Sequence, residues 1–300
     1  MNEVTSLLQE NKRIKSANYV RNFEKIFACP ICHASMKVSE QKSLICLNHH
    51  TFDFAKQGYI NLTTSSGKTK YGKDLFEARR KLITECAFFE PLHHAITNAL
   101  EKYIVKTKES ISILDTGCGE GSHLSAICDF VCANLVERVI GVGIDISKEG
   151  IMIAAKSYTD KIWAVANLAN TPFMNQQFDV ILNILSPSNY AEFNRLLKPN
   201  GLVIKVVPQS GYLKELRHLF YKTDKQNYSN AAIVERFKER YQFVDHVRLT
   251  YTRSLNESSI KLLVNMTPLS WATTEEQVTS FVKANSMKIT VDLDVLIGKH

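Results

Sequence analysis

Four residues near the start of the chain have the types and the spacing of a zinc site. Cys29 and Cys32 form a Cys-x-x-Cys knuckle. Cys46 follows 14 positions later, and His50 lies four positions beyond it. Three thiolates and one imidazole suit tetrahedral zinc, and four protein ligands leave no open position for substrate or water. We therefore predict a structural zinc ion, with His49 as a competing fourth ligand and with free cysteines or a redox pair as alternatives.

The segment HTFDFAKQGYINL after these cysteines interleaves aromatic side chains with a lysine. Phe52, Phe54 and Tyr59 could stack on bases while Lys56 contacts phosphates. The same rings could instead form the small core of the zinc module, and for Phe52 and Phe54 we expect the core role. Because a closed zinc site does no chemistry, we expect this module to serve recognition.

The net charge of +7 is concentrated in the first third of the chain. Residues 1–110 hold 17 Lys and Arg against 11 Asp and Glu, whereas residues 111–300 hold 20 against 19. A segregated basic excess suits a polyanionic partner, because neutralising phosphates releases counterions. A solvated basic surface without a partner is the alternative.

Composition and cysteine usage indicate a soluble protein with reduced thiols. The chain has 45% hydrophobic and 22% charged residues, which is typical of a globular fold. Apolar runs are too short to cross a bilayer, and the polar start lacks the apolar core of a secretory signal. The four cysteines outside the zinc pattern occur singly, which argues against a disulfide framework. We expect a cytoplasmic protein without membrane contacts.

The segment ISILDTGCGEGSHLSAICDF, from residue 111, predicts a cofactor site. An apolar run ends in Asp115 and leads through Gly117, Gly119 and Gly121 into a helix-like stretch. This is the strand, turn, helix order of a nucleotide-type cofactor site, in which glycines let backbone amides approach the ligand. Asp145 ends the next strand-like run, where a carboxylate can accept both ribose hydroxyls.

Strands alternate with helices through the rest of the chain, which predicts an α/β fold with a class I, Rossmann-like domain. We expect its first five strands to be parallel, with ligand at their carboxyl ends. Asn167 and Leu168, at the end of the third strand, are placed to recognise adenine, although a turn with one inward apolar residue is the alternative. We expect the last helix and strands to complete the sheet and the segment MTPLSW to line the pocket.

Glu120 decides between two cofactors. A dinucleotide places its pyrophosphate on a helix N-terminus, where an acidic residue would repel it. S-adenosylmethionine carries an ammonium that an acid near the turn attracts. We therefore predict a methyltransferase rather than a dehydrogenase. A non-enzymatic RNA-binding protein with a degenerate methyltransferase fold is a further alternative, although the glycines and Asp145 are intact.

Several segments together resemble one family, the RlmA/TlrB family of 23S ribosomal RNA (guanine-N1)-methyltransferases, whose Gram-positive type is the nearer one. They are CPIC…CLNHHTFDFAKQGYINL, FEARRKLITECAFFEPL, ILDTGCGEGSH, GIDISKEGIMIAAK, ILSPSNYAEFNRLLKPNG and NMTPLSW. The resemblance implies a zinc-binding RNA-recognition module at 27–62, a basic linker with helices at 63–110 and a methyltransferase domain at 111–300. Residues 1–26 form an N-terminal extension outside it.

The resemblance also implies site residues. It favours His50 over His49 as the fourth zinc ligand beside Cys29, Cys32 and Cys46, and it places Gly119 and Glu120 in the cofactor-binding turn. It further implies cofactor contacts at Phe89, where the family usually has tyrosine, and at Tyr212, where it usually has histidine. Ser122 and His123 replace aromatic residues after the glycine turn, which reshapes the pocket mouth.

The implied substrate is a guanine in a hairpin loop of 23S ribosomal RNA, a site of the hairpin 35 type, with another RNA as the alternative. An unpaired loop base costs less to flip into a pocket. The family implies a homodimer whose chains shape an RNA cleft. A basic cluster would line it, although a solvated helix face explains the same residues, which are Lys68, Lys70, Lys73, Arg79, Arg80 and Lys81.

Guanine N1 carries a proton at neutral pH, so its methylation requires a base. Asp115 and Asp145 are better explained as structural and ribose-binding acids. Asn183, in the segment NILSP, can hydrogen-bond a guanine edge but is too weakly basic to deprotonate it. The sequence therefore leaves the catalytic residue unidentified.

Overall fold

The computed structural model describes residues 2–64, 71–104, 109–220, 228–267 and 286–300. Within them a large sheet has eight strands in the order β10-β11-β9-β8-β5-β6-β7-β4. Strands β5 to β9 run parallel to their neighbours in this group, and β10 and β11 are antiparallel. The strands are β4 (Ile60–Asn61), β5 (Ser110–Thr116), β6 (Arg138–Asp145), β7 (Ile162–Val165), β8 (Phe178–Ile184), β9 (Leu197–Pro208), β10 (Gln242–Asn256) and β11 (Ser286–Lys299).

The central strands are buried on both faces, which explains their continuous apolar runs. Successive residues of a strand point to opposite faces, so Ile113 and Leu114 join separate core clusters, as do Val180 and Ile181. The α/β class I fold with five parallel strands, predicted from the alternation of segments, is confirmed.

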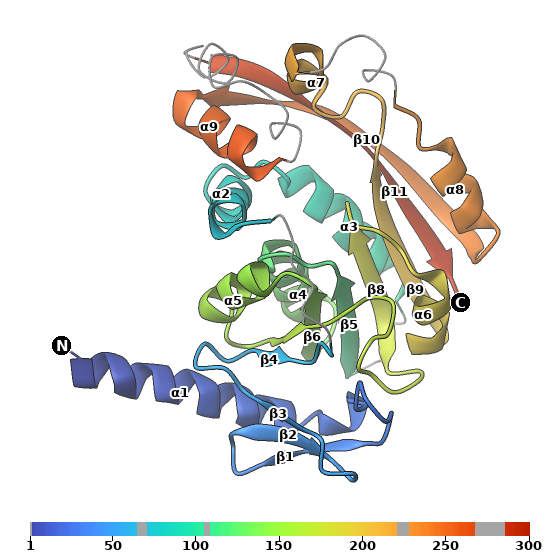
Figure 1. The fold of residues 1–300 in the computed structure, drawn as a ribbon. Coiled ribbons are helices and arrows are strands. Elements are labelled where there is room, and N and C mark those ends of the chain that lie inside the picture. The colour runs from blue at the N-terminus through green and yellow to red at the C-terminus, as the bar shows by residue number, and fades with distance from the viewer. Residues whose placement is uncertain (1, 65–70, 105–108, 221–227, 268–285) are drawn as a thin grey trace.

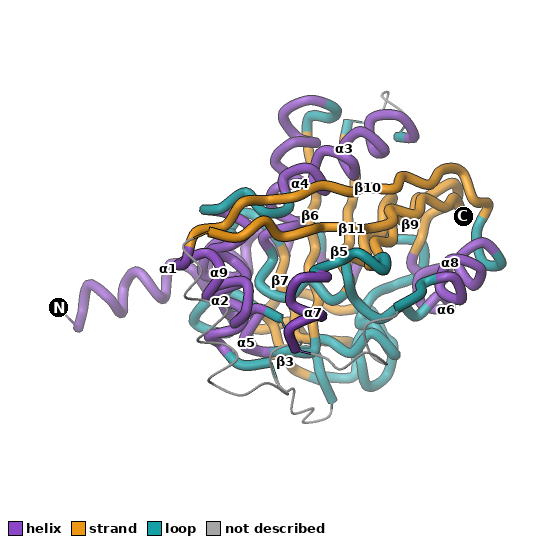
Figure 2. The backbone as a smooth tube through the Cα atoms, turned by 90° about the horizontal axis from the view of Figure 1, so that it is seen from above, coloured by secondary structure: helices purple, strands orange, loops and turns teal. Residues whose placement is uncertain are grey.

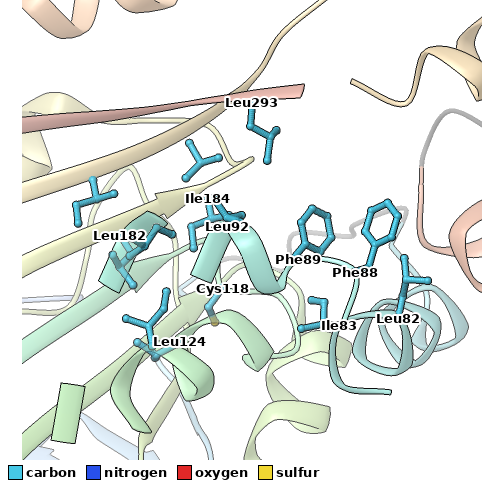
Figure 3. Packing of buried hydrophobic residues seen from close by; sticks show 14 of the residues in the cluster. Leu82, Ile83, Phe88, Phe89, Leu92, Cys118, Leu124, Leu182, Ile184 and Leu293 are labelled. Carbon is cyan, nitrogen blue, oxygen red and sulfur yellow. The ribbon is translucent and has the colours of Figure 1, made fainter. Parts of the chain in front are cut away.

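One face of the sheet is covered by three helices, α3 (Glu90–Tyr103), α4 (Ser122–Asn134) and α5 (Lys148–Ser157). Leu92, at the start of α3, and Leu124, in α4, pack into one core with Leu182 of β8 (Figure 3). Phe88 and Phe89 lie at the entry to α3 with their rings edge to face at 5.0 Å. The ring of Phe89 also meets the ring of His123, in the first turn of α4, at 5.2 Å.

The other face is covered by α6 (Tyr190–Leu196) and α8 (Ala231–Lys238) and by the N-terminal part of the chain. In Figure 1 that part lies below the sheet. It contains α1 (Asn2–Arg21), the short helix η1 (Glu24–Ile26) and a separate small sheet of β1 (Met36–Ser39), β2 (Ser43–Cys46) and β3 (Thr51–Asp53).

The N-terminal part shares its core with the large sheet. Phe27 packs on Phe173 with ring centroids 5.6 Å apart, and Leu44 belongs to the same buried cluster as Val142. Strand β4 pairs in parallel with β7 at the sheet edge, and the backbone N–H of Leu62 donates to Val165. The zinc module therefore contributes to burying the sheet.

Three helices lie over the carboxyl ends of the parallel strands. They are α2 (Lys73–Thr84), α7 (Lys214–Phe220) and α9 (Glu257–Met266), and α2 packs against α9 (Figure 1). The antiparallel strands β10 and β11 run side by side across the molecule (Figure 2). Among the described helices, none is both long and apolar enough to cross a membrane.

Candidate functional site

The four predicted zinc ligands come together in the N-terminal part. One ligand atom from each of Cys29, Cys32, Cys46 and His50 lies within 4.8 Å of every other. The Sγ atoms of Cys32 and Cys46 are 3.7 Å apart, and Nδ1 of His50 is 3.5 Å from Sγ of Cys29 and 3.4 Å from Sγ of Cys46. Tetrahedral zinc with Zn–S near ~2.3 Å requires sulfur separations of roughly 3.8 Å. These separations fit a zinc ion.

Backbone groups support the thiolates. The N–H of Ile31 lies 3.4 Å from Sγ of Cys29, and the N–H of His50 lies 3.3 Å from Sγ of Cys46. A backbone hydrogen bond from Ala34 lowers the pKa of the Cys32 thiol to about 6. Donors of this kind stabilise the thiolate that zinc requires. His49 is exposed in a left-handed conformation and lies outside the cluster.

The aromatic residues of the zinc module are mainly core residues. Phe54 and Tyr59 are buried, and Phe52 is partly buried against the core shared with the sheet. Lys56 is exposed. The expected core role of the two phenylalanines agrees with this burial, and Phe54 and Tyr59 present no open ring face for a base.

A cavity of about 890 Å³ lies at the carboxyl ends of the parallel strands. This volume is within the range of sites that hold small molecules and cofactors. Strands β6 to β9 and the segments after them form one side, and α2 with the end of α9 covers the other. The site therefore lies where a doubly wound fold binds its ligand.

Six of the ten residues predicted to bind the cofactor line this cavity: Phe89, Gly117, Asp145, Asn167, Leu168 and Tyr212. The other four, Asp115, Gly119, Glu120 and Gly121, belong to β5 and the glycine turn beside the cavity. The residues of the C-terminal motif MTPLSW divide similarly. Met266 and Thr267 line the cavity, and the motif from position 268 onward lies outside the described residues.

The glycine turn is shaped by packing. Gly117 and Gly121 have φ values of 75° and 81°, which favour glycine. A Cβ on Gly117 would overlap the hydroxyl of Ser186, and one on Gly121 would overlap the ring of Trp163. The amides of Gly117 and Cys118 both donate to the carbonyl of Ile144. These amides are thus used inside the protein, although the sequence pattern predicts that they approach the ligand.

Asp145 links the turn to the next strand. One of its carboxylate oxygens accepts the N–H of Gly119 at 2.9 Å, and the other accepts the N–H of Ser147 at 2.7 Å. Burial raises the pKa of Asp145 despite these two bonds. Each oxygen retains a lone pair for a further donor. The carboxylate is therefore held in place and still able to accept ligand hydroxyls.

Arg79 of α2 reaches the glycine turn from above. Its Nε lies 3.2 Å from the carboxylate of Glu120, which is fully buried. Although burial opposes its charge, Glu120 and then Asp115 and Asp145 hold the pKa of Arg79 above its usual value. The sequence predicts that Arg79 faces RNA, but its side chain points to Glu120. The two residues are 41 positions apart in the chain, so no local pattern indicates their pairing.

The carboxylates near the turn outnumber their cationic partner. Asp115 is 1% exposed, and its Oδ1 has no hydrogen-bond partner among the described residues. Burial raises the pKa of Asp115 to about 7, although Arg79 opposes this shift. A cationic ligand beside the turn would stabilise the ionised carboxylates. This surplus of negative charge fits the ammonium and sulfonium groups of S-adenosylmethionine.

Two histidines pack near Phe89, and one of them, His123, lines the cavity. Nε2 of His93 is 2.8 Å from Nδ1 of His123, and the rings of Phe89 and His123 meet edge to face at 5.2 Å. Burial lowers the pKa of His93 to about 4 and that of His123 well below its usual value. Both rings are therefore neutral, and Nε2 of His123 has no partner among the described residues.

A lysine in the middle of β9, Lys205, also lines the cavity, although the sequence motifs did not predict it as a site residue. Nζ of Lys205 donates to Oδ1 of Asn183 at 2.6 Å and to the carbonyl of Ser186 at 3.3 Å. Asn183 is fully buried, and its Nδ2 donates to Thr116 and to the carbonyl of Pro187. The available signal was a lysine inside the apolar run GLVIKVVP.

An open groove continues outside the cavity. The two hollows share Leu168 and Pro187, and the groove adds Tyr190 of α6, Arg236 of α8 and Arg240, which follows α8. The two arginines are exposed, and neither takes part in the ion pairs found in the described part of the chain. This positive rim was not recognised in the sequence.

Four residues of the basic cluster predicted between the zinc module and the methyltransferase domain lie in the described part of the chain. Arg79 points to Glu120, Lys73 pairs with Glu77 at 3.1 Å, and Arg80 lies 3.9 Å from Glu85. Lys81 is exposed. Lys68 and Lys70 lie outside the described residues.

Comparison with protein families gives two matches. A family model described as "RlmA, N-terminal", a zinc ribbon, matches residues 27–68. A model described as "Methyltransferase domain" matches residues 113–201. The two matches correspond to the cysteine cluster and to the strands and turns that form one side of the cavity.

Curated relatives span nearly the whole chain. A Bacillus subtilis (strain 168) protein provisionally named 23S rRNA (guanine-N(1)-)-methyltransferase YxjB is 50% identical over 276 residues, which cover 91% of this chain and 96% of the relative. The 23S rRNA (guanine(748)-N(1))-methyltransferase of Streptomyces fradiae is 27% identical over 252 residues, which cover 84% of this chain and 88% of the relative. A Micromonospora griseorubida protein provisionally named 23S rRNA (guanine-N(1)-)-methyltransferase is also 27% identical, and the match covers 91% of this chain and 96% of the relative.

Proposed function

Because the chain belongs to the RlmA family of 23S ribosomal RNA (guanine-N1)-methyltransferases, we propose that it methylates guanine N1 in a 23S rRNA hairpin loop of the hairpin 35 type. S-adenosylmethionine supplies the methyl group, and a zinc ion holds the N-terminal module. The observation that carries this proposal is the large cavity at the carboxyl ends of the strands, with surplus carboxylates beside the glycine turn.

The cavity suggests a pose for the cofactor. Asp145 accepts the ribose hydroxyls through the lone pairs that its two amide bonds leave free. Asn167 and Leu168 contact the adenine. The acids of the turn attract the ammonium, with Asp115 supplying an unpartnered carboxylate oxygen. Phe89 and Tyr212 line the remaining wall. When bound, the cofactor supplies an electrophilic methyl group, and this chain has to position it and exclude water.

The open groove offers a route for the RNA. It begins where the cavity opens, at Leu168 and Pro187, and it carries Arg236 and Arg240. Phosphates on either side of a flipped guanine would contact these arginines. We place the target at the guanine that gives the Streptomyces fradiae relative its name, position 748. The zinc module then serves RNA recognition from a fixed place under the sheet.

Two further proposals concern the assembly and its location. We propose that the chain acts as a homodimer in the cytoplasm, in line with the family resemblance seen in its motifs. Light scattering after gel filtration should give twice the mass of 34.0 kDa. A mass of one chain at micromolar concentration would rule out the dimer, and it would leave the proposed activity untouched.

Purified protein tests the activity directly. It is incubated with isotopically labelled S-adenosylmethionine and a transcript of the 23S rRNA hairpin, and the nucleosides are then separated by mass spectrometry. We expect labelled 1-methylguanosine from this transcript. A matched transcript with the target guanine changed to adenosine should give none. Label in a different nucleoside, or label only in a transfer RNA control, would overturn the assignment.

A further inference from the structure

The proposed reaction needs a proton acceptor. Guanine N1 must lose its proton before or during attack on the methyl group, and a base within hydrogen-bond reach is required. Among the ionisable groups that line the cavity, Asp145 accepts two backbone amides, and burial lowers the pKa of His123 so far that its free Nε2 is a weak base. Arg79 stays protonated, and burial raises the pKa of Tyr212 to about 12. Lys205 also lines the cavity, and its amine can accept a proton when it is neutral.

Lys205 lies on the floor of the cavity, near the loop that follows β8. Lys205 is only 3% exposed. It lines the cavity together with Ser186 and Pro187. This loop packs directly on the glycine turn, because Ser186 fills the space above Gly117. A proton acceptor that contacts this loop would therefore lie close to the methionine part of the cofactor.

The strands beside β9 give Lys205 no counter-ion. Its partner on β8 is the amide Asn183, and its partner on β11 is Leu296. The nearest carboxylate on the same face of β11 is Asp294, which is held by His246 and Asn230. None of the ion pairs found in the described part of the chain includes Lys205, and burial lowers its pKa to about 8.

The hydrogen bonds of Nζ define its free position. A neutral amine has two N–H donors and one lone pair. Oδ1 of Asn183 and the carbonyl oxygen of Ser186 accept hydrogen bonds from the two N–H groups. Asn183 cannot turn away, since its own Nδ2 bonds Thr116 and Pro187. With both protons directed to these oxygens, the lone pair is left for a group in the cavity.

We propose that Lys205 is the general base that removes the N1 proton of the target guanine, with Asn183 as its positioning residue. This inference rests on the proposed function. The neutral Nζ takes the proton from N1, and the freed electron pair of N1 forms a bond to the methyl carbon. The carbon–sulfur bond breaks, and its electrons remain on sulfur. The products are 1-methylguanine, S-adenosylhomocysteine and a lysine ammonium that returns its proton to water.

The test uses single-turnover methylation of the hairpin transcript between pH 6 and 10. For the unchanged protein we expect a rate that rises with pH and levels off near 8. Lys205→Met and Lys205→Arg should both lose about 10²- to 10⁴-fold in rate, with S-adenosylmethionine affinity unchanged. Their residual rate should keep rising above pH 8, because hydroxide is the base that remains.

Matched variants distinguish a base at position 205 from a cation or a purely structural side chain. Lys161→Met removes a second buried lysine outside the cavity, and it should leave the rate unchanged. Methylamine added to Lys205→Ala should restore part of the lost rate. If Lys205→Arg keeps the full rate, the residue acts as a cation and the proposal fails. It also fails if the pH profile is the same with and without Lys205. If the unchanged protein forms no 1-methylguanosine, the proposed function fails first.

Discussion

The zinc cluster and the large cavity both gather ionisable side chains away from water, but they satisfy them differently. In the zinc cluster, three thiols and one imidazole lie within 4.8 Å of one another, and backbone N–H groups support the sulfurs. Beside the cavity, Asp115 has an oxygen without a partner, and Lys205, which lines the cavity, has no counter-ion in the described part of the chain. The first set is closed, and the second is open.

The difference separates structural chemistry from ligand chemistry. A closed ligand set adds its binding energy to the fold and leaves nothing for a substrate. An open set costs stability in the free protein, because each buried group lacks its best partner. That cost in stability is recovered when the cofactor and the target guanine fill the cavity. Changes in the two regions should therefore affect different measurements.

The largest effect should follow removal of zinc. Structural zinc contributes on the order of 10 kcal/mol to the fold of small zinc modules. A strong chelator, or Cys32→Ser, should remove amide-exchange protection from residues 29–62 and lower the melting temperature. Because Leu44 shares a core with Val142, we also expect partial loss of protection in β6 and β7.

Cofactor affinity is the control for that experiment. It should change less than about tenfold, or ~1.4 kcal/mol, when zinc is removed. Equal protection with and without zinc would contradict the structural role. Loss of cofactor binding in proportion to the metal would mean that the two regions form a single site.

Asp115→Asn should separate stability from binding in the cavity. The folded carboxyl has its pKa raised to about 7 from 3.8, so the folded state holds its proton longer than the unfolded chain. Stability of the free protein should therefore fall as pH rises from about 4 to 7. At pH 8 the variant should be more stable by roughly 1 kcal/mol or more.

Isothermal titration of the same variant should show a loss of cofactor affinity, in contrast to its gain in stability. S-adenosylmethionine should bind about tenfold or more weakly, since a hydrogen bond to a charged group is worth about 1.5–3 kcal/mol. Glu77→Gln, on the outer part of α2, is a matched control that should change neither quantity. If unfolding of Asp115→Asn and of the unchanged protein depended on pH in the same way, burial of the Asp115 carboxyl would not reduce the stability of the free protein.

A smaller effect is expected at the groove. Arg236→Glu should weaken binding of the hairpin RNA and lower the slope of log affinity against log salt by about 1. Lys238→Glu makes the same charge change in α8, but Lys238 is not among the residues of the groove and pairs with Glu235. Fluorescence anisotropy should show the larger loss for Arg236→Glu. Equal losses would mean that general charge, and not the groove, attracts the RNA.

A small effect is expected at Lys161, a buried lysine outside the cavity. Its Nζ pairs with Asp129 at 3.1 Å and Asp160 at 2.9 Å, and both acids are exposed. Although burial opposes it, Asp160 holds the pKa of Lys161 above its usual value. Lys161→Met should cost about 1 kcal/mol or less, because the acids remain hydrated.

Lys205→Met is the counterpart of that change. The pKa of Lys205 lies below its usual value, so the folded state is penalised relative to the unfolded chain at every pH below about 8. Replacing Lys205 by methionine removes this penalty. Urea unfolding at pH 7 should show no loss of stability for Lys205→Met. A loss larger than that of Lys161→Met would show that Lys205 is structural.

Local spacing made part of this site predictable. The zinc ligands are recognisable because Cys29 and Cys32 share one turn and His50 follows Cys46 by four positions. The strand, turn and helix around Gly117 are similarly local. Composition and alternation of segments were sufficient for the fold class, because parallel strands need helices between them.

Contacts between distant segments could not be predicted. The pairing of Arg79 with Glu120 depends on how α2 lies over the sheet, and no short spacing encodes it. The free position of Lys205 depends on the loop after β8 and on Asn183. The pairing of β4 with β7 likewise emerges only in the assembled structure. These features follow from tertiary packing, which overrides local pattern.

Primer extension across the large-subunit RNA tests the central claim most directly. Methylation at N1 blocks base pairing, so reverse transcriptase stops one nucleotide before the modified guanine. RNA from cells that contain the protein should give a stop in the target hairpin, and RNA from cells without it should give none. Restoring the intact gene should restore the stop, and an Asp145→Ala copy should not. An identical stop pattern in all of these cells would contradict the proposed function.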